Sequence, residues 1–383
     1  MTLELECFAI VAPGLEILAL AEARALGLPA ELQAGGGGIT WRGDLRGVLL
    51  ANAGLRIASR VVVRLATFEA RSFAELERHA RQIPWSSVMS REGSARFRVT
   101  CKKSKLYHSD AVAQRLADAL TRAVPGARAA GGSGTEEEAE TADDAQLFVV
   151  RMLRDVCTVS ADTSGALLHR RGYRQATAKA PLRETIAAAL LAASGWDGRH
   201  PLVDPLCGSG TIPIEAALLA RGLPPGGRRH FAAERWPGVS RELGDRVRRE
   251  LNERARADAP ARIAGSDRDA GAIDASRGNA ERAGVPGDVE LSVRSLSAIE
   301  FPAAPRGWVV SNPPYGVRVG DADRVRDLWA QLGNVLRERA GGWRVALLSP
   351  DPALERQLRI PLTVVAQTTN GGIPVRLVVG EVA

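Results

Sequence analysis

Five consecutive residues, Ser311-Asn312-Pro313-Pro314-Tyr315, have the chemistry needed to hold a flat ring that bears an amine. They follow an apolar strand that we expect at Trp308–Val310, and proline cannot continue a strand because it lacks the backbone donor. The Asn312 side chain and the next carbonyls should therefore be fixed at a strand's carboxyl end. An Asn-Pro pair also begins ordinary turns, so this segment alone leaves both interpretations open.

A second pattern lies about a hundred residues upstream, where residues 201–213 read Pro-Leu-Val-Asp-Pro-Leu-Cys-Gly-Ser-Gly-Thr-Ile-Pro. It predicts a short strand, a Gly-x-Gly turn and a helix, and such a turn lets the backbone approach a ligand. Pro213 stands where the dinucleotide pattern needs its third glycine, which disfavours an NAD site. The turn instead resembles the first motif of methyltransferases that use S-adenosylmethionine (SAM).

A second acid, Asp267, ends the next expected strand, and a helix should follow from Ala270 to Arg282. In dinucleotide folds, an acid at this place holds ribose hydroxyls and comes about 20 residues after the first strand. Here Asp267 comes 63 positions after Asp204. We therefore interpret residues 222–256, which include a Pro/Gly stretch and an arginine-rich run, as an insertion.

The three patterns alternate strand and helix in an order that predicts an α/β fold. Two more apolar strands are expected at Val289–Val293 and Trp343–Leu348, with an amphipathic helix at Val325–Leu336. Together they predict a mostly parallel, Rossmann-like sheet with helices on both faces. Ligands in such sheets bind at the carboxyl ends of the strands, where all three patterns fall.

The N-terminal half alternates short strands and helices and predicts an α+β arrangement in two units. The first unit has expected strands at 5–11, 38–41 and 60–67 and helices at 15–26 and 45–53. The second has expected strands at 96–100, 147–151 and 157–160 and a helix at 111–123. Residues 129–144 are rich in Gly and Glu without apolar periodicity, which indicates a flexible acidic loop.

Composition excludes several classes of protein. The longest Ala/Leu stretch, at 186–193, is too short to span a membrane, and Glu4 and Glu6 argue against a secretory signal, so we expect a cytoplasmic protein. The four cysteines are too dispersed for a zinc site or a disulfide framework, and no metal is expected. The net charge is +7, and residues 51–105 hold 12 basic and 4 acidic residues, which favours phosphate contacts.

Longer segments resemble one family. Residues 97–109 (Phe-Arg-Val-Thr-Cys-Lys-Lys-Ser-Lys-Leu-Tyr-His-Ser) and residues 162–174, which end in Arg-Arg-Gly-Tyr-Arg, are similar to the THUMP-domain-containing RNA methyltransferases. Residues 180–184 and 229–237 fit the same family, so the likeness covers nearly the whole chain. The nearest group is the bacterial enzymes that methylate the exocyclic N2 of guanine in large-subunit (23S) ribosomal RNA, and close relatives act on transfer RNA.

This resemblance implies three domains and one cofactor. A ferredoxin-like unit at 1–66 and a THUMP RNA-binding domain at 67–165 would precede a Rossmann-like methyltransferase domain at 166–383 with a terminal antiparallel strand. The cofactor would be SAM. The expected partner is RNA, with rRNA preferred over tRNA, and the expected state is a monomer.

The resemblance also assigns residues to the site. The four residues Asn312, Pro313, Pro314 and Tyr315 would form the catalytic turn. Cofactor binding is carried over to Asp204, Cys207, Gly208, Ser209, Gly210, Thr211, Asp267 and Arg268, with Pro181 and Glu184 at the methionine end. One departure is visible, because Ser295 stands where the family usually has an Asp that contacts the adenine amine. Cys207 is expected to matter for shape rather than reactivity.

The catalytic turn contains no side chain that can serve as a base. The Asn312 oxygen and the Pro313 carbonyl would instead accept the amine hydrogens and aim the nitrogen lone pair at the methyl group, while Tyr315 stacks on the base. The same groups suit the N6 amine of adenine, so a DNA adenine methyltransferase is an alternative. A non-catalytic RNA-binding assembly factor is another, supported by the Ser295 departure alone.

Overall fold

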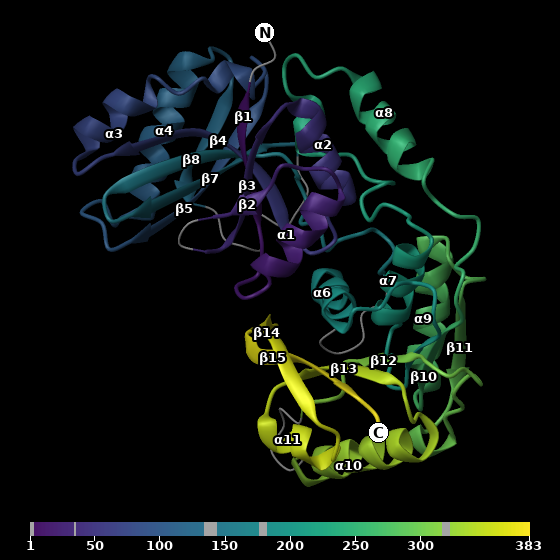
Figure 1. Cartoon of the computed structure of the whole chain (residues 1–383). Helices are drawn as coiled ribbons and strands as arrows, with labels where there is room; N and C mark the ends of the chain where they lie inside the picture. Colours follow the sequence, from purple (N-terminus) through teal and green to yellow (C-terminus); the bar gives the residue numbers. More distant parts are fainter. Residues whose placement is uncertain (1–3, 34–35, 134–143, 176–181, 316–321) are drawn as a thin grey trace.

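The computed structural model describes residues 4–33, 36–133, 144–175, 182–315 and 322–383, which form two sheets joined by buried contacts (Figure 1). The first sheet has eight strands in the order β2-β3-β1-β4-β8-β7-β5-β6. Its strands are β1 (Leu5–Ile10), β2 (Glu31–Leu32), β3 (Gly38–Gly43), β4 (Arg60–Glu69), β5 (Ser94–Lys102), β6 (Arg128–Ser133), β7 (Gln146–Leu153) and β8 (Val156–Asp162). Its helices are α1 (Glu16–Ala25), α2 (Leu45–Gly54), α3 (Phe73–Ala80) and α4 (Ser109–Ala123).

One continuous sheet contains the strands of both predicted N-terminal units. Strand β4 pairs antiparallel with β1 on one side and with β8 on the other, and it runs across the boundary predicted at residue 66. Residues 129–133, expected to belong to a loop, instead lie in the edge strand β6 beside β5. The Ser133 hydroxyl accepts the Val99 amide at 3.0 Å, so pairing compensates for a Gly-rich sequence of low strand propensity. The prediction of a loop was wrong there, and residues 134–143 lie outside the described part.

The second sheet has seven strands in the order β11-β10-β9-β12-β13-β15-β14. Its first five strands run parallel and β15 is antiparallel to β13, which confirms the Rossmann-like α/β fold. The strands are β9 (Leu202–Asp204), β10 (Ile263–Asp267), β11 (Val289–Val293), β12 (Trp308–Ser311), β13 (Arg344–Ser349), β14 (Leu362–Asn370) and β15 (Ile373–Glu381). The helices are α6 (Glu184–Ser194), α7 (Thr211–Ala220), α8 (Arg241–Asn252), α9 (Ala270–Ala283), α10 (Ala322–Arg339) and α11 (Pro352–Gln357).

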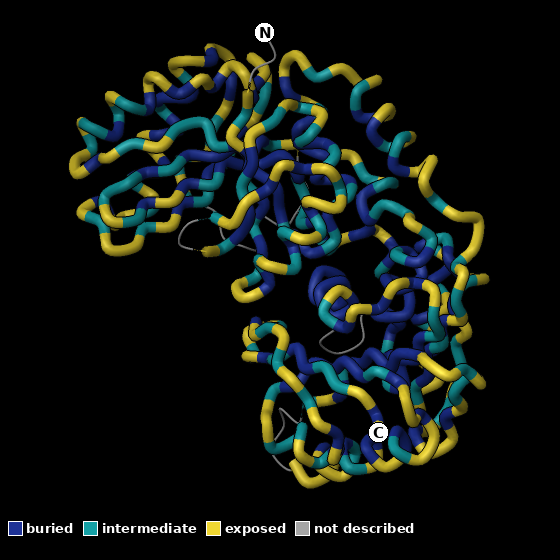
Figure 2. Tube along the Cα trace, in the orientation of Figure 1, coloured by how far each residue is buried: buried dark blue, intermediate teal, exposed yellow. Residues whose placement is uncertain are grey.

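Alternating side chains of the central strands supply two separate cores. Val310 and Ala346 belong to the core that includes residues of α6 and α7, whereas Val309 and Val345 pack with Trp329 of α10. This alternation follows from the two-residue period of a strand covered on both faces. Helix α6 is buried along nearly its whole length (Figure 2). The strands that carry the three sequence patterns are therefore packed on both faces.

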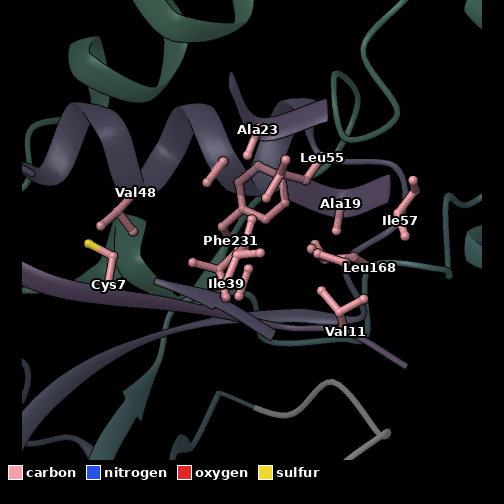
Figure 3. Packing of buried hydrophobic residues seen from close by; sticks show 14 of the residues in the cluster. Cys7, Val11, Ala19, Ala23, Ile39, Val48, Leu55, Ile57, Leu168 and Phe231 are labelled. Carbon is pink, nitrogen blue, oxygen red and sulfur yellow. The ribbon is translucent and has the colours of Figure 1, made fainter. Parts of the chain in front are cut away.

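The catalytic half and the N-terminal half share buried contacts. Phe231, from the predicted insertion, and Leu168 lie in one cluster with Val11, Ala19 and other residues of the N-terminal sheet and helices (Figure 3). Helix α8 of the same insertion lies beside α2, where Arg46 forms an ion pair with Glu250 (Figure 1). The predicted insertion therefore contacts the N-terminal half both through Phe231 and through helix α8.

A second contact joins the halves through the turn between β1 and α1. Gly14 has a φ of +87°, and a Cβ atom placed on it would lie 1.8 Å from the backbone oxygen of Gln367 in β14. A side chain cannot fit there without moving one half away from the other. The Gly14 amide is also tied to the Glu16 carboxylate at 2.8 Å, which fixes the turn.

Replacing Gly14 with Ala should therefore destabilise the protein more than replacing Gly27 with Ala. Gly27 has a similar φ of +90°, but a Cβ atom placed on it would meet no atom within 4 Å, so its variant reports the backbone cost alone. We expect about 1–2 kcal/mol for Gly27→Ala and about 1–3 kcal/mol more for Gly14→Ala because of the added clash. Denaturant unfolding of both variants measures the difference, and equal losses would contradict the contact.

Among the described residues, no helix is both long and apolar enough to cross a membrane.

Candidate active site

The three strands that carry the predicted patterns are neighbours, in the order β10-β9-β12, and they end at one edge of the sheet. A cavity of about 1170 Å³ opens at this edge. The predicted residues that line it are Asp204, Cys207, Gly208, Ser209, Thr211, Asp267, Arg268, Ser295, Asn312, Pro313, Pro314 and Tyr315. Gly210 and Glu184 lie next to lining residues rather than on the wall, and Pro181 lies outside the described residues.

Helix α9 fixes the glycine turn between β9 and α7. The Ser276 hydroxyl donates to the Gly208 carbonyl at 2.7 Å, and the Asn279 amide donates to the Ser209 carbonyl at 3.0 Å. A Cβ on Gly210, whose φ is +82°, would lie 3.0 Å from Ser276, whereas a Cβ on Gly208 would meet no atom within 4 Å. The turn is therefore closely packed against α9 at Gly210, whereas at Gly208, which lines the cavity, there is open space beside the backbone. Sequence reasoning missed Ser276 and Asn279.

The Asp267 carboxylate is oriented by two backbone amides. Its Oδ2 accepts from Gly208 at 3.1 Å, and its Oδ1 accepts from Asp269 at 3.0 Å. Each carboxylate oxygen can accept more than one hydrogen bond, so both can still bind ligand hydroxyls. The side chain is half-buried and lines the cavity, which suits a pair of ribose hydroxyls.

Asp204 connects the glycine turn to the catalytic turn. The Ser311 hydroxyl donates to its Oδ1 at 2.6 Å, and the Leu206 amide donates to the same atom at 3.2 Å. The residue is only 1% exposed, and burial raises its pKa to about 7, with the charge of Asp267 adding to the effect. Ser311 belongs to the predicted turn, but nothing in the sequence indicates its contact with Asp204.

The Asn312 side chain is held by a chain of hydrogen bonds. The Tyr315 hydroxyl donates to Asn312 Oδ1, and the Asn370 amide donates to the Tyr315 hydroxyl at 3.4 Å. Trp329 holds the turn from the other side, because its indole N–H donates to the Pro314 carbonyl at 3.3 Å. Burial raises the pKa of Tyr315 to about 12, so its hydroxyl stays protonated and acts as the donor.

Asn370, at the end of β14, also lines the cavity. An Asn-Gly-Gly sequence at 370–372 signals a hairpin turn, but nothing in it indicates a contact with a residue 55 positions earlier.

The remaining predicted acid, Glu184, begins helix α6 and is 3% exposed. Its Oε1 lies 3.2 Å from Arg174, which also donates to the Thr211 hydroxyl at 3.1 Å. Its Oε2 is buried and has no hydrogen-bond partner among the described residues. Burial raises the pKa of Glu184 to about 7 despite the arginine. An unpaired buried carboxylate oxygen of this kind suits a cationic group.

The departure at Ser295 is located at the rim of the cavity. The residue is exposed, and its hydroxyl lies 3.1 Å from the hydroxyl of Ser297. The preceding residue, Arg294, forms an ion pair with Glu300 at 2.9 Å. A carboxylate for the adenine amine is therefore absent at position 295, and a serine hydroxyl is available in its place.

Two family profiles match this chain. That of the RMKL-like methyltransferase domain covers residues 171–378, and that of the RlmL ferredoxin-like domain covers residues 6–62. The chain belongs to the RMKL-like methyltransferase family. The methyltransferase family predicted from the sequence is thus confirmed, together with its ferredoxin-like N-terminal unit and its dependence on SAM, whereas the THUMP domain stays a prediction.

Some relatives of this RMKL-like methyltransferase match it over nearly their whole length, and others match it over only part of their length. A putative RNA methyltransferase of Synechocystis sp. is 32% identical over 97% of this chain and 95% of its own length. The ribosomal RNA large subunit methyltransferase K/L of Syntrophotalea carbinolica is 33% identical over 100% of this chain but only 54% of its own length. The chain therefore matches about half of that longer relative.

Solved structures show the same fold. SMU.472, a putative methyltransferase crystallised with SAH, has a TM-score of 0.85 and 29% identity, covering 100% of this chain and 99% of its own. A protein of Listeria monocytogenes, described as a predicted N6-adenine-specific DNA methylase, has a TM-score of 0.85 and 30% identity, covering 98% of this chain and 96% of its own.

The described residues fit SAM. The bare face of Gly208 admits close approach of a ligand, Asp267 offers acceptors for ribose hydroxyls, and Glu184 has an unpaired oxygen suited to an ammonium group. SAM supplies a methyl group on a positively charged sulfur. We expect the positive sulfur of SAM to favour an ionised Asp204, which lines the cavity, and its ammonium group to favour an ionised Glu184, which lies just behind the wall.

The affinity for SAM should increase as the pH rises toward about 7 and then level off. Burial raises the pKa of Asp204 and of Glu184 to about 7, so both are largely protonated in the free protein at lower pH. The cationic ligand favours their ionised forms, and binding should release protons. Calorimetry across this range measures both quantities, with Glu184→Gln expected to flatten the profile. An affinity that falls with rising pH would contradict the assignment.

Proposed function

We propose that this methyltransferase transfers the methyl group of SAM to the exocyclic N2 amine of a guanine in structured RNA, with 23S rRNA as the preferred substrate. One observation carries the proposal: the Asn312–Tyr315 turn and the glycine turn line the same cavity at adjacent strand ends. An amine held by the first turn would lie beside a cofactor held by the second.

The mechanism depends on positioning rather than on a strong base. An amine attached to a nucleobase is a weak nucleophile because its lone pair is delocalised into the ring. We assign one amine hydrogen to Asn312 Oδ1 and the other to the Pro313 carbonyl, which together would aim the lone pair at the methyl group. The Tyr315 hydroxyl already occupies part of Oδ1 and fixes which way the amide faces. We expect the Tyr315 ring to stack on the base and the proton to leave to solvent after transfer.

An RNA substrate is supported by the relatives and by the N-terminal half. Two relatives bear the names putative RNA methyltransferase and ribosomal RNA large subunit methyltransferase. We propose that residues 67–165 form a THUMP RNA-binding domain, preceded by the ferredoxin-like unit at 1–66 and followed by the catalytic domain at 166–383. A tRNA guanine is the second substrate we consider, since the site itself does not distinguish the two RNAs.

A DNA adenine-N6 methyltransferase is the alternative with a specific observation in its favour. The similar protein of Listeria monocytogenes carries that description, and the same oxygen acceptors suit either amine. A non-catalytic assembly factor is the remaining alternative. It rests on Ser295, yet that residue still lines the cavity, and the glycine turn and Asn312 are both in place.

The deciding experiment identifies the methylated nucleoside. Purified protein and SAM labelled in the methyl group are incubated separately with unmodified rRNA, tRNA and DNA, and each product is digested to nucleosides. We expect N2-methylguanosine from rRNA. Label in N2-methylguanosine from tRNA alone would reassign the substrate, N6-methyladenine in DNA would overturn the proposal, and the absence of label in all three would favour the assembly factor.

A further inference from the structure

Residues 102–108, which comprise the last residue of β5 and the loop that leads to α4, concentrate a rare residue type. We call this segment the loop at 102–108. Three of the four lysines of this chain, Lys102, Lys103 and Lys105, lie in it, whereas arginine supplies nearly all other positive charge. All three are exposed, as is Arg154 of the neighbouring turn between β7 and β8. None of the four has a carboxylate within ion-pair distance in the part of the chain that the structure describes.

This loop is held in one shape by the adjacent turn. The Asp155 carboxylate accepts the Lys105 amide at 2.7 Å, and the Ser104 hydroxyl accepts the Asp155 amide at 3.0 Å. The Arg154 amide donates to the Lys102 carbonyl at 3.2 Å. The Asp155 carboxylate thus holds the Lys105 amide through Oδ1, while its Oδ2 lies 3.8 Å from the side chain of Arg71. Leu106 anchors the loop in the core at 6% exposure. Among the described residues, the side chains of the three lysines and Arg154 therefore lie close in the fold and are exposed to a negatively charged ligand.

Tyr107 presents an aromatic ring at the same place. It is 68% exposed, although large aromatic side chains normally bury most of their surface. Its ring centroid lies 4.1 Å from that of His108, with 41° between the planes. An exposed ring supported by a neighbouring ring, with cations nearby in the same loop that have no ion-pair partner among the described residues, is typical of sites that bind single-stranded nucleic acid through base stacking and phosphate contacts.

We propose that the loop at 102–108 is a contact site for an unpaired stretch of RNA, in which Tyr107 stacks on a base while the three lysines and Arg154 contact phosphates. The inference rests on the proposed RNA substrate and adds a second binding point to it. None of these residues lines the cavity, so the loop acts in capture of the RNA and not in methyl transfer. It therefore contributes to KM rather than to kcat.

The test of Tyr107 measures binding of a short fluorescein-labelled oligouridylate and of an RNA duplex by anisotropy, using the full chain. Tyr107→Ala should weaken oligouridylate binding by about 5- to 150-fold, and Tyr107→Phe, which keeps the ring, should bind nearly as well as the wild type. Duplex binding should change little. Ile17→Ala is the matched control, because Ile17 is also large and 72% exposed.

The charges are tested by the salt dependence of the same binding. Replacing Lys102, Lys103 and Lys105 together with Gln should reduce the slope of log affinity against log salt by about 2, since each phosphate contact to a single strand contributes about 0.7. The control removes the same charge from the exposed arginines of α8 (Arg241, Arg246 and Arg249→Gln) and should leave the slope unchanged.

Three results would overturn the proposal. Unchanged oligouridylate affinity in Tyr107→Ala, or a slope that changes equally in both triple variants, removes the site. Competition by polyglutamate as strong as by oligouridylate assigns the loop to acidic protein partners instead. These measurements need no turnover, so a protein that methylates RNA yet shows no loss of binding contradicts only this inference, while normal loop binding without methylation contradicts only the proposed function.

Discussion

Replacing Asn312 with Ala should lower kcat by about 10²–10³-fold, the usual loss when one preorganised polar group is removed from a reacting centre. The Asn312 oxygen is held by Tyr315 in the cavity wall, where the amine must be oriented. The side chain does not support the glycine turn, so SAM affinity should stay within about twofold of wild type. Single-turnover methylation with a natural RNA, together with calorimetric titration of SAM, measures both effects.

Asn334→Ala is the matched control for that variant. Asn334 lies exposed on α10 and contacts Arg337 rather than the cavity, so its replacement should leave kcat unchanged. Tyr315→Phe should give an intermediate loss, because it keeps the ring but releases the Asn312 amide. Full activity in Asn312→Ala would show that another group orients the amine.

Replacing Asp267 with Ala should weaken SAM binding by about 10- to 100-fold, as expected for hydrogen bonds to a charged group. The variant loses the acceptors for the ribose and also frees the Gly208 amide, which Asp267 Oδ2 now holds at 3.1 Å. At saturating SAM, kcat should be nearly preserved because the catalytic turn is untouched. Titration of SAM and of its product SAH should show similar losses, since both carry the same ribose.

Asp269→Ala separates this effect from a general loss of structure. Asp269 caps α9 by accepting the Gly271 amide at 2.9 Å, so its replacement should lower the unfolding free energy by about 1 kcal/mol. Its effect on SAM affinity should be small. If Asp269→Ala weakens SAM binding as much as Asp267→Ala, the ribose assignment is wrong.

The strand-end patterns could be predicted because each is local in sequence. Asp204, Asp267 and Asn312 each follow a short apolar strand and precede a turn, and parallel strands bring such ends to one edge. The residues that fix these groups could not be predicted. Ser276 contacts a carbonyl 68 positions earlier, and Asn370 contacts a hydroxyl 55 positions earlier. Such contacts depend on packing between elements and leave no periodic signal.

The N-terminal half shows the same limit. Strand β6 has a sequence, Arg-Ala-Ala-Gly-Gly-Ser, that resembles a loop, and only its partner β5 makes it a strand. The single eight-stranded sheet also joins segments that hydrophobic periodicity divides into two units, because the pairing of β4 with β8 bridges about a hundred residues. The strands with apolar sequences could thus be predicted locally, whereas β6 and the pairing of β4 with β8 depend on contacts between distant segments.

The turn at Gly14 is one of the places where the N-terminal half contacts the catalytic half. The halves touch there, at Gln367 of β14, and again where α8 meets α2, so two separated contacts brace the chain (Figure 1). We expect these two contacts to restrict hinge motion between the halves, and so to restrict changes in the spacing between the loop at 102–108 and the catalytic cavity. If the loop binds RNA as proposed, the distance between an unpaired stretch and the target base would then help to decide which nucleotide reaches the catalytic cavity.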